Sequence, residues 1–216
     1  LLCLSLDTVA KPKRLVTLGA GVTETVFALG SGELVVGVDV SSLHPPKATQ
    51  KPKVGYVRMT SAEGIASLKP DLVLAASTLG PAAVKEQLKA AKIRLELVAS
   101  PKSIDQAMTR IDAIGAILNK KEQAALLKKD ISDKIAQAKA HQAGKPKPRV
   151  LFVFVHGGAT VNVAGTETAA DVMIHAAGGD NAITEYSGYR PLTAEALLAA
   201  KPDNILATTR SLKAVG

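Results

Sequence analysis

Residues 58–75 read RMTSAEGIASLKPDLVLA, and residues 190–207 read RPLTAEALLAAKPDNILA. Both stretches keep an arginine, an Ala-Glu pair, a Lys-Pro-Asp triplet and a closing Leu-Ala at matching positions. The copies are too far apart for a solenoid, whose units recur every few tens of residues. The repeat therefore predicts two related lobes, each with a short helix that leads through Lys-Pro-Asp into a buried strand. Two lobes imply a cleft, and small ligands commonly bind in clefts between lobes.

The composition favours an α/β protein. Hydrophobic residues make up 47% of the 216 residues, but aromatic residues only 3%, and tryptophan is absent. Alanine, valine and leucine must therefore form the interior, which suits parallel strands covered by helices. A chain of this length can bury one large core or two modest ones.

The formal net charge of +8 raises the question of nucleic-acid binding. The lysines are scattered along the chain among acidic neighbours, and no aromatic-studded basic platform or nucleic-acid motif is present. A solvated basic surface is the favoured interpretation, and we expect no nucleic-acid partner. Binding to DNA or to a membrane surface would require these charges to cluster on one face.

The first lobe begins with a βαβ pattern, in which glycines separate a helix from the strands on either side. We expect this lobe to close near residue 100. The predicted elements are a strand at 14–18, a helix at 23–29, a strand at 34–39, a loop at 41–54, a strand at 71–75, a helix at 81–91 and a strand at 94–98.

Residues 103–141 carry apolar side chains at spacings of three and four, which predicts helix almost throughout. Gly115 and Asn119 are the points at which this helix could be interrupted. A long helix between two lobes would act as a stiff strut. The segment GKPKP at 144–148 ends it.

The second lobe begins with residues 149–155, which are apolar on both faces and predict a central strand. An extended piece at 160–164, a helix at 169–177 and a strand at 203–207 follow. By symmetry with the first lobe, we expect this lobe to be C-terminally truncated, with an uncovered sheet edge. The predicted divisions are a signal-peptide remnant at 1–10, an N-terminal lobe at 11–101, a linking helical segment at 102–144 and an incomplete C-terminal lobe at 145–216.

The first ten residues, LLCLSLDTVA, are mostly apolar and end in a small residue before a charged run. This pattern is typical of the end of a secretory signal peptide, and a short first strand is the alternative. Cys3 is the only cysteine, so the mature protein would need no disulfide. Cys3 as a lipid-anchored residue is disfavoured because Ser-Leu follows it. No other run approaches the length of a membrane span. We expect a periplasmic protein.

Gly19-x-Gly21 lies between a strand and a helix, where a dinucleotide-binding loop would begin. Glu24 occupies the place of the third glycine, and no basic residue follows in the loop. An ordinary tight turn is favoured.

Tyr56 lies in the segment VGYVR, just before the repeated helix. A tyrosine in a glycine-flanked loop can stack on a flat ligand or, once deprotonated, bind ferric iron. A phenol ordinarily keeps its proton up to about pH 10, so metal binding needs help from the metal or a nearby cation. Arg58 could supply it by hydrogen bonding to the phenolate. The alternative is a tyrosine that only covers the core at a loop.

His156 follows the long strand at 149–155 and precedes two glycines. Ligands bind at the carboxyl ends of strands in α/β lobes, so His156 could be a second ligand or a pocket wall. A structural histidine is the alternative. His44, His141 and His175 show no metal-ligand spacing to one another, which disfavours a zinc site. No nucleophile–histidine arrangement or pair of hydrolytic carboxylates is recognisable.

Glu63 and Glu195 are the matched acids of the repeat. Each falls in the first turn of a predicted helix, where the helix dipole favours a carboxylate, and Thr60 could complete the first cap. Helix capping alone would explain the presence of each acid when it is considered by itself. The presence of one in each lobe suggests instead a pair of charges that dock a dimeric basic partner.

The segment GYVRMTSAEG at 55–64 resembles a motif of known periplasmic binding proteins. Over about residues 13–212 the chain is similar to the substrate-binding proteins of bacterial ABC importers in which a rigid helix joins two lobes. Vitamin B12 and ferric-siderophore binding proteins belong to this class. The motif itself resembles the heme-binding branch, in which the motif tyrosine is the axial ligand of heme iron.

The resemblance implies that Tyr56 binds heme iron, that Arg58 hydrogen bonds to it and that Glu63 and Glu195 dock onto the permease dimer. It implies less strongly that His156 is a second axial ligand. The implied protein is not an enzyme but a monomeric carrier of one or two hemes in iron acquisition, downstream of an outer-membrane heme receptor. A corrinoid or ferric-siderophore carrier is the alternative, and a nitrogenase-like or chelatase-type enzyme a third, which the lack of mature cysteines disfavours.

Overall fold

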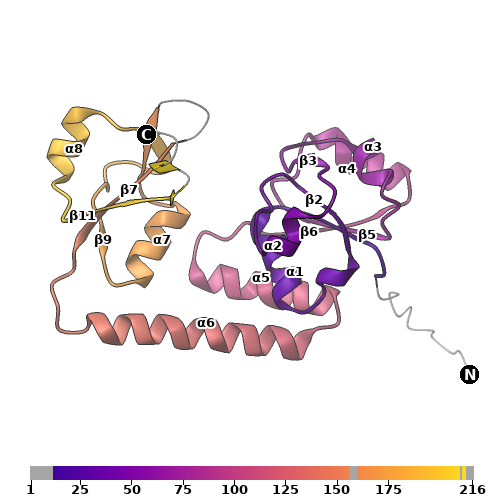
Figure 1. Ribbon diagram of the computed structural model, residues 1–216, viewed down its shortest axis with the longest axis horizontal. Helices are drawn as coiled ribbons and strands as arrows, with labels where there is room; N and C mark the ends of the chain where they lie inside the picture. Colours follow the sequence, from indigo (N-terminus) through magenta and orange to yellow (C-terminus); the bar gives the residue numbers. More distant parts are fainter. Residues whose placement is uncertain (1–11, 156–159, 210, 213–216) are drawn as a thin grey trace, which may run out of the picture. The chain divides into compact units, whose positions relative to one another are not determined.

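The computed structural model describes residues 12–155, 160–209 and 211–212 (Figure 1). The chain divides into two compact units. The N-terminal unit contains the chain up to Pro101 together with residues 105–128, and the C-terminal unit contains residues 102–104 and the chain from Lys129. Both combine helices with a sheet, as the predicted α/β class requires. The predicted signal remnant, including Cys3, lies outside the described residues.

The N-terminal unit is built on a four-stranded parallel sheet in the order β2-β1-β5-β6. The central strands are apolar on both faces, so both faces must be covered. Leu15, Val16 and Leu18 are fully buried, as are Val73 and Leu74 of the neighbouring strand. The strands are β1 (Leu15–Leu18), β2 (Val35–Val38), β5 (Leu72–Ala76) and β6 (Arg94–Val98).

The helices of this unit follow the predicted order, except that a short helix at 46–49 lies in the segment predicted as a loop. The first begins earlier than predicted, because the carbonyl of Gly19 already accepts bonds from the N–H groups of Val22 and Thr23. The elements around the sheet are α1 (Ala20–Ala28), the short 3₁₀ helix η1 (Gly32–Leu34), α2 (Pro46–Thr49), the hairpin strands β3 (Gly55–Tyr56) and β4 (Met59–Thr60), α3 (Ala62–Ala66) and α4 (Ala82–Ala90).

The helical segment after residue 103 consists of two helices, α5 (Ile104–Ile117) and α6 (Lys121–Gln142). The interruption falls at Asn119, one of the two predicted positions, which has φ +54°. A Cβ built on Gly115 would lie 2.7 Å from the Cβ of Ala124, so only glycine lets the two helices approach this closely. The division between the units lies within α6, the long helix by which the chain passes from one unit to the other. None of the described helices combines the length and apolarity needed to cross a membrane.

The C-terminal unit has a mixed sheet around the central strand β7 (Arg149–Val155). The sequence predicted the strands at 149–155, 160–164 and 203–207, but neither those at 180–181 and 189–191 nor the antiparallel direction of two of the pairings. Its core is formed mainly by Leu151, Val163 and Ile183. The other elements are β8 (Val161–Ala164), α7 (Ala169–Ala176), β9 (Asp180–Asn181), β10 (Tyr189–Pro191), α8 (Ala194–Ala200) and β11 (Asn204–Ala207), with β11 parallel to β7 at the edge of the described sheet.

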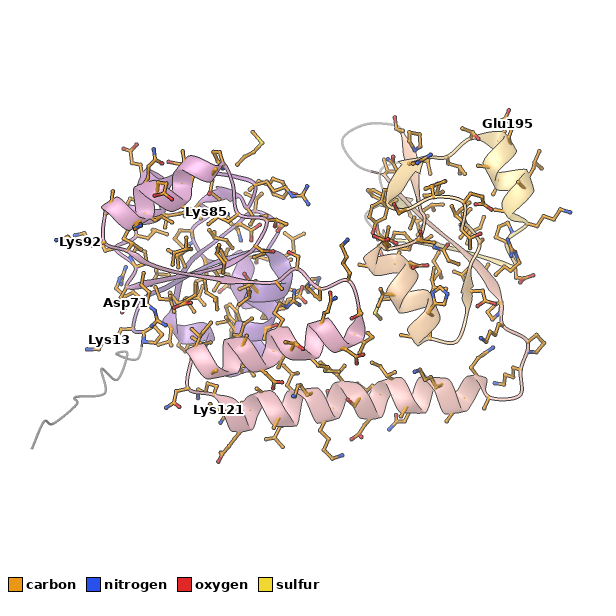
Figure 2. All side chains as sticks on the ribbon, turned by 180° about the vertical axis from the view of Figure 1, so that it is seen from behind. Lys13, Asp71, Lys85, Lys92, Lys121 and Glu195 are labelled. Carbon is orange, nitrogen blue, oxygen red and sulfur yellow. The ribbon has the colours of Figure 1, made fainter. Side chains whose placement is uncertain are left out.

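The Lys-Pro-Asp repeat corresponds to the same local structure in both units. Each lysine follows a helix and adopts a left-handed backbone, with φ +47° at Lys69 and +39° at Lys201. The Asp71 carboxylate accepts a bond of 2.7 Å from the backbone N–H of Lys13, and the two residues lie side by side in Figure 2. The aspartate thereby ties the end of its own helix to the start of the central strand.

Two arginines complete this arrangement. The backbone N–H of Arg14 donates to Asp71, and that of Arg149 donates to Asp203. Each guanidinium also donates to carbonyl groups at or just past the end of the repeated helix, α3 in one unit and α8 in the other. These carbonyls would otherwise lack partners. The repeat therefore reflects the same helix-to-strand unit in both parts of the chain, as predicted.

Candidate functional site

A hollow of about 220 Å³ lies in the N-terminal unit where β1, β5 and β6 end. The carboxyl edge of a parallel sheet is the usual place for ligands in α/β folds. This volume is below that of typical small-molecule pockets, so it can enclose only part of a large ligand. The lining residues are Gly19, Ala20, Gly21, Val22, Ser41, Tyr56, Val57, Arg58, Ala76, Thr78, Ser100 and Arg110.

The β3–β4 hairpin brings Tyr56 and Arg58 to this hollow. Val57, 6% exposed, packs in the core of this unit, while its neighbours Tyr56, 43% exposed, and Arg58 flank it in the hairpin, and all three border the hollow. Gly55 allows the tight entry into the hairpin, because its φ of +96° disfavours any other residue. The sequence predicted a loop here, since strands of two residues give no periodic signal.

Backbone hydrogen bonds fix the hairpin on both sides. The N–H of Gly80 donates to the carbonyl of Val57 over 3.0 Å, and the N–H of Thr60 donates to the carbonyl of Gly80 over 3.1 Å. On the other side, the N–H of Val40 donates to the carbonyl of Gly55 over 2.9 Å. The position of Tyr56 is therefore set by backbone bonds to the loops after β2 and β5 and not by its own side-chain contacts.

The polar groups of Tyr56 and Arg58 are free to meet a ligand. Within the described ranges, the Tyr56 hydroxyl and the Arg58 guanidinium form no hydrogen bond or ion pair with other residues. The predicted bond between them stays a prediction. The backbone of Val40 bonds to Gly55, and Met59 pairs with Tyr56 in the hairpin. Their side chains are 48% and 77% exposed, which leaves apolar surface next to the hairpin.

A buried carboxylate that the sequence analysis missed organises the wall of the hollow. Asp39 is fully buried at the end of β2. It accepts hydrogen bonds from the N–H of Gly19 at 2.9 Å, the N–H of Ser41 at 3.1 Å, and the hydroxyls of Ser41 and Ser42. The Asp39 carboxylate therefore holds two wall segments, the β1–α1 turn and the loop after β2. The sequence signal that could have revealed Asp39 is an acidic residue directly after an apolar strand.

Glu63 and Glu195 do not line the hollow. Both are exposed and lie in the first turns of α3 and α8, as the repeat predicted, and Glu195 is visible at the start of α8 in Figure 2. Thr60 was predicted to cap α3, but the cap is Ser61, whose hydroxyl accepts a bond from the N–H of Gly64. The backbone N–H of Glu195 and the hydroxyl of Thr193 lower the pKa of Glu195.

The described histidines make no metal site. His175 meets the carbonyl of Asp171 through Nδ1 at 2.9 Å, and His141 lies 3.3 Å from the ammonium group of Lys145. Over residues 12–155, 160–209 and 211–212, no three His, Cys, Asp or Glu side chains group so as to hold a metal ion. An iron atom at Tyr56 would therefore have to bring most of its own ligands. His156 lies outside the described residues.

Comparisons with known proteins agree with this architecture. The chain is similar to the solved periplasmic heme-binding protein BhuT in complex with two hemes, with 38% identity and a TM-score of 0.86 over 96% of this chain and 80% of that one. It is 32% identical, over 94% of its length, to an uncharacterized ABC transporter substrate-binding lipoprotein, YvrC, of Bacillus subtilis. A cobalamin-binding protein of Halobacterium salinarum is 29% identical over 91% of this chain.

The chain spans 66% of the length of the Bacillus relative and 54% of the Halobacterium relative. The model of the family described as periplasmic binding protein matches residues 15–215. Because this match covers nearly the whole chain, the protein belongs to the periplasmic binding protein family.

Proposed function

We propose that the protein binds heme in the periplasm and delivers it to an ABC importer in the inner membrane. The observation that carries the proposal is the placement of Tyr56. Its phenol is partly exposed on a firmly anchored hairpin, at the carboxyl edge of a parallel sheet and near an arginine that has no partner among the described residues. The similarity to solved heme-binding proteins supports the same ligand.

The chemistry of heme suits a site with few protein ligands. The porphyrin supplies four nitrogen ligands, so one phenolate oxygen from Tyr56 suffices to hold ferric iron. The Arg58 guanidinium lines the same hollow and would favour the charged phenolate. The exposed apolar side chains of Val40 and Met59 would cover part of a porphyrin face.

The further roles are proposals from the sequence. His156 is the candidate second axial ligand, and the ligand is one heme or two. Glu63 and Glu195 are the candidate docking acids for basic residues of the permease dimer. Both are exposed in the first turns of corresponding helices, which leaves their carboxylates accessible. We propose no catalytic activity.

A corrinoid carrier is the second candidate, favoured by the similarity to a cobalamin-binding protein. Titration of the purified protein with hemin and with cyanocobalamin, followed by absorption, separates the two. We expect saturable hemin binding, lost or sharply weakened in Tyr56→Phe. Tyr189→Phe is the matched control, because Tyr189 is 46% exposed but lies on β10, outside the hollow. Saturable binding of cyanocobalamin but not hemin would contradict the heme proposal.

A further inference from the structure

Arg110 stands out among the residues that line the hollow. It comes from α5, and its guanidinium packs against Gly21 in the first turn of α1. A Cβ built on Gly21 would lie 2.7 Å from Nη2 and 3.0 Å from Nη1 of Arg110. Glycine at position 21, which the sequence analysis assigned to a tight turn, is therefore what makes room for this cation.

The guanidinium is poorly compensated in its surroundings. Among the residues that the structure describes, the buried Nε of Arg110 has no hydrogen-bond partner. Burial lowers the pKa of Arg110, and the nearby Glu24 carboxylate opposes that shift only in part. An ionised group kept in such a place costs free energy unless an anion meets it.

The geometry points to Arg110 as the receptor for a carboxylate of the bound ligand. This inference rests on the proposed heme function and concerns the carboxylate groups by which the site would recognise the ligand. Arg110 and Tyr56 line one hollow, so a ligand held through iron at Tyr56 can present an acidic edge to Arg110. Thr78 and Ser100 line the same hollow and add hydroxyl groups suited to an anion.

A carboxylate is the anion that this arrangement favours. The planar fork of a guanidinium matches the two oxygens of a carboxylate in a bidentate contact. Heme carries two propionates, whereas the peripheral side chains of a corrinoid end mainly in neutral amides. Arg110 would therefore help the site to select an acidic tetrapyrrole, a choice that Tyr56 alone does not make.

The test compares hemin with hemin dimethyl ester, which keeps the iron and the ring but lacks the ionised carboxylates. Both ligands are titrated into the wild-type protein and into Arg110→Gln. We expect Arg110→Gln to weaken hemin binding about 10- to 100-fold, the range for a hydrogen bond to a charged group. Binding of the ester and the spectrum of the iron complex should stay the same in both proteins.

Two further variants keep the outcome interpretable. Arg94→Gln removes the same charge from β6, where Arg94 pairs with Glu96 at 2.9 Å and does not line the hollow, so its hemin affinity should match wild type. Gly21→Ala leaves position 110 intact but pushes the guanidinium aside, and it should reproduce part of the hemin-specific loss. Circular dichroism confirms that each variant is folded.

The outcomes separate this inference from the proposed function. If Arg110→Gln weakens hemin and its ester equally, or neither, Arg110 is not a carboxylate receptor, although heme binding stands. If the wild-type protein retains neither porphyrin, the proposed function fails and this inference fails with it.

Discussion

Asp39→Asn perturbs a fully buried carboxylate beside the candidate site. The Asp39 carboxylate accepts bonds from Gly19 and Ser42 through one oxygen, and from the N–H and hydroxyl of Ser41 through the other. Asparagine keeps the first oxygen, but its amide N–H₂ turns a donor toward the N–H of Ser41. The variant therefore leaves a donor unpaired and removes the charge that strengthens the remaining bonds.

The size of the effect follows from these contacts. A hydrogen bond to a charged group contributes about 1.5–3 kcal/mol, and an unpaired buried donor costs about 1–3 kcal/mol. Because Asp39 is fully buried and the Ser41 side of the network is lost, we expect unfolding to become about 2–4 kcal/mol easier. The hydroxyl chain from Ser42 through Thr23 to Thr17 would also be weakened, which favours the upper part of this range.

Urea denaturation followed by far-UV circular dichroism measures this loss. Asp112→Asn is the control, because the Asp112 carboxylate is 53% exposed and its ion pair with Lys128 should contribute about 0–1 kcal/mol. The hemin affinity of Asp39→Asn should also fall, since Gly19 and Ser41 form part of the hollow. A free energy of unfolding within about 1 kcal/mol of wild type would refute this account of the network.

The remaining predictions concern backbone strain and capping. Gly55→Ala should destabilise the protein by about 1–2 kcal/mol and weaken hemin binding, because φ is +96° and the new Cβ would lie 3.2 Å from the Met59 carbonyl. Gly30→Ala shares the strain at φ +71° but meets open space, so it should leave hemin binding unchanged; equal affinities in both variants would contradict the hairpin argument. Thr193→Ala should cost about 1 kcal/mol through loss of the α8 cap, measured by urea denaturation. Since the pKa of Glu195 is lowered, its stabilisation is present above the ordinary value of 4.5 and is lost as pH falls through the lower folded value. A stability–pH curve for Glu195→Gln that keeps this acid-side loss would contradict the assignment.

Features encoded locally were predictable from the sequence. The Lys-Pro-Asp repeat predicted the helix-to-strand unit on both sides, because the turn depends on a left-handed lysine and an aspartate that binds the neighbouring strand. Asn119 was a recognisable point of interruption for the helical segment. The antiparallel pairing of β8 with β7 and β10 was not predictable, since alternation alone does not give strand direction.

The candidate site was only partly predictable for a related reason. The motif predicted Tyr56 and Arg58, and both line the hollow on either side of the buried Val57. Arg110 gave no signal, because its contact with Gly21 depends on how α5 packs against α1, far away in the sequence. Ser61 and not Thr60 is the cap because α3 begins one residue later than expected. Helix boundaries are the feature that sequence patterns define least well.

Resonance Raman spectroscopy of the hemin complex tests whether Tyr56 binds the iron, because excitation into a phenolate-to-iron transition enhances vibrations of the bound phenolate. We expect such bands in the wild-type complex, a shift when tyrosine is ring-deuterated, and their loss in Tyr56→Phe but not in Tyr189→Phe. A wild-type hemin complex without phenolate bands, or bands that persist in Tyr56→Phe, would contradict iron binding by Tyr56.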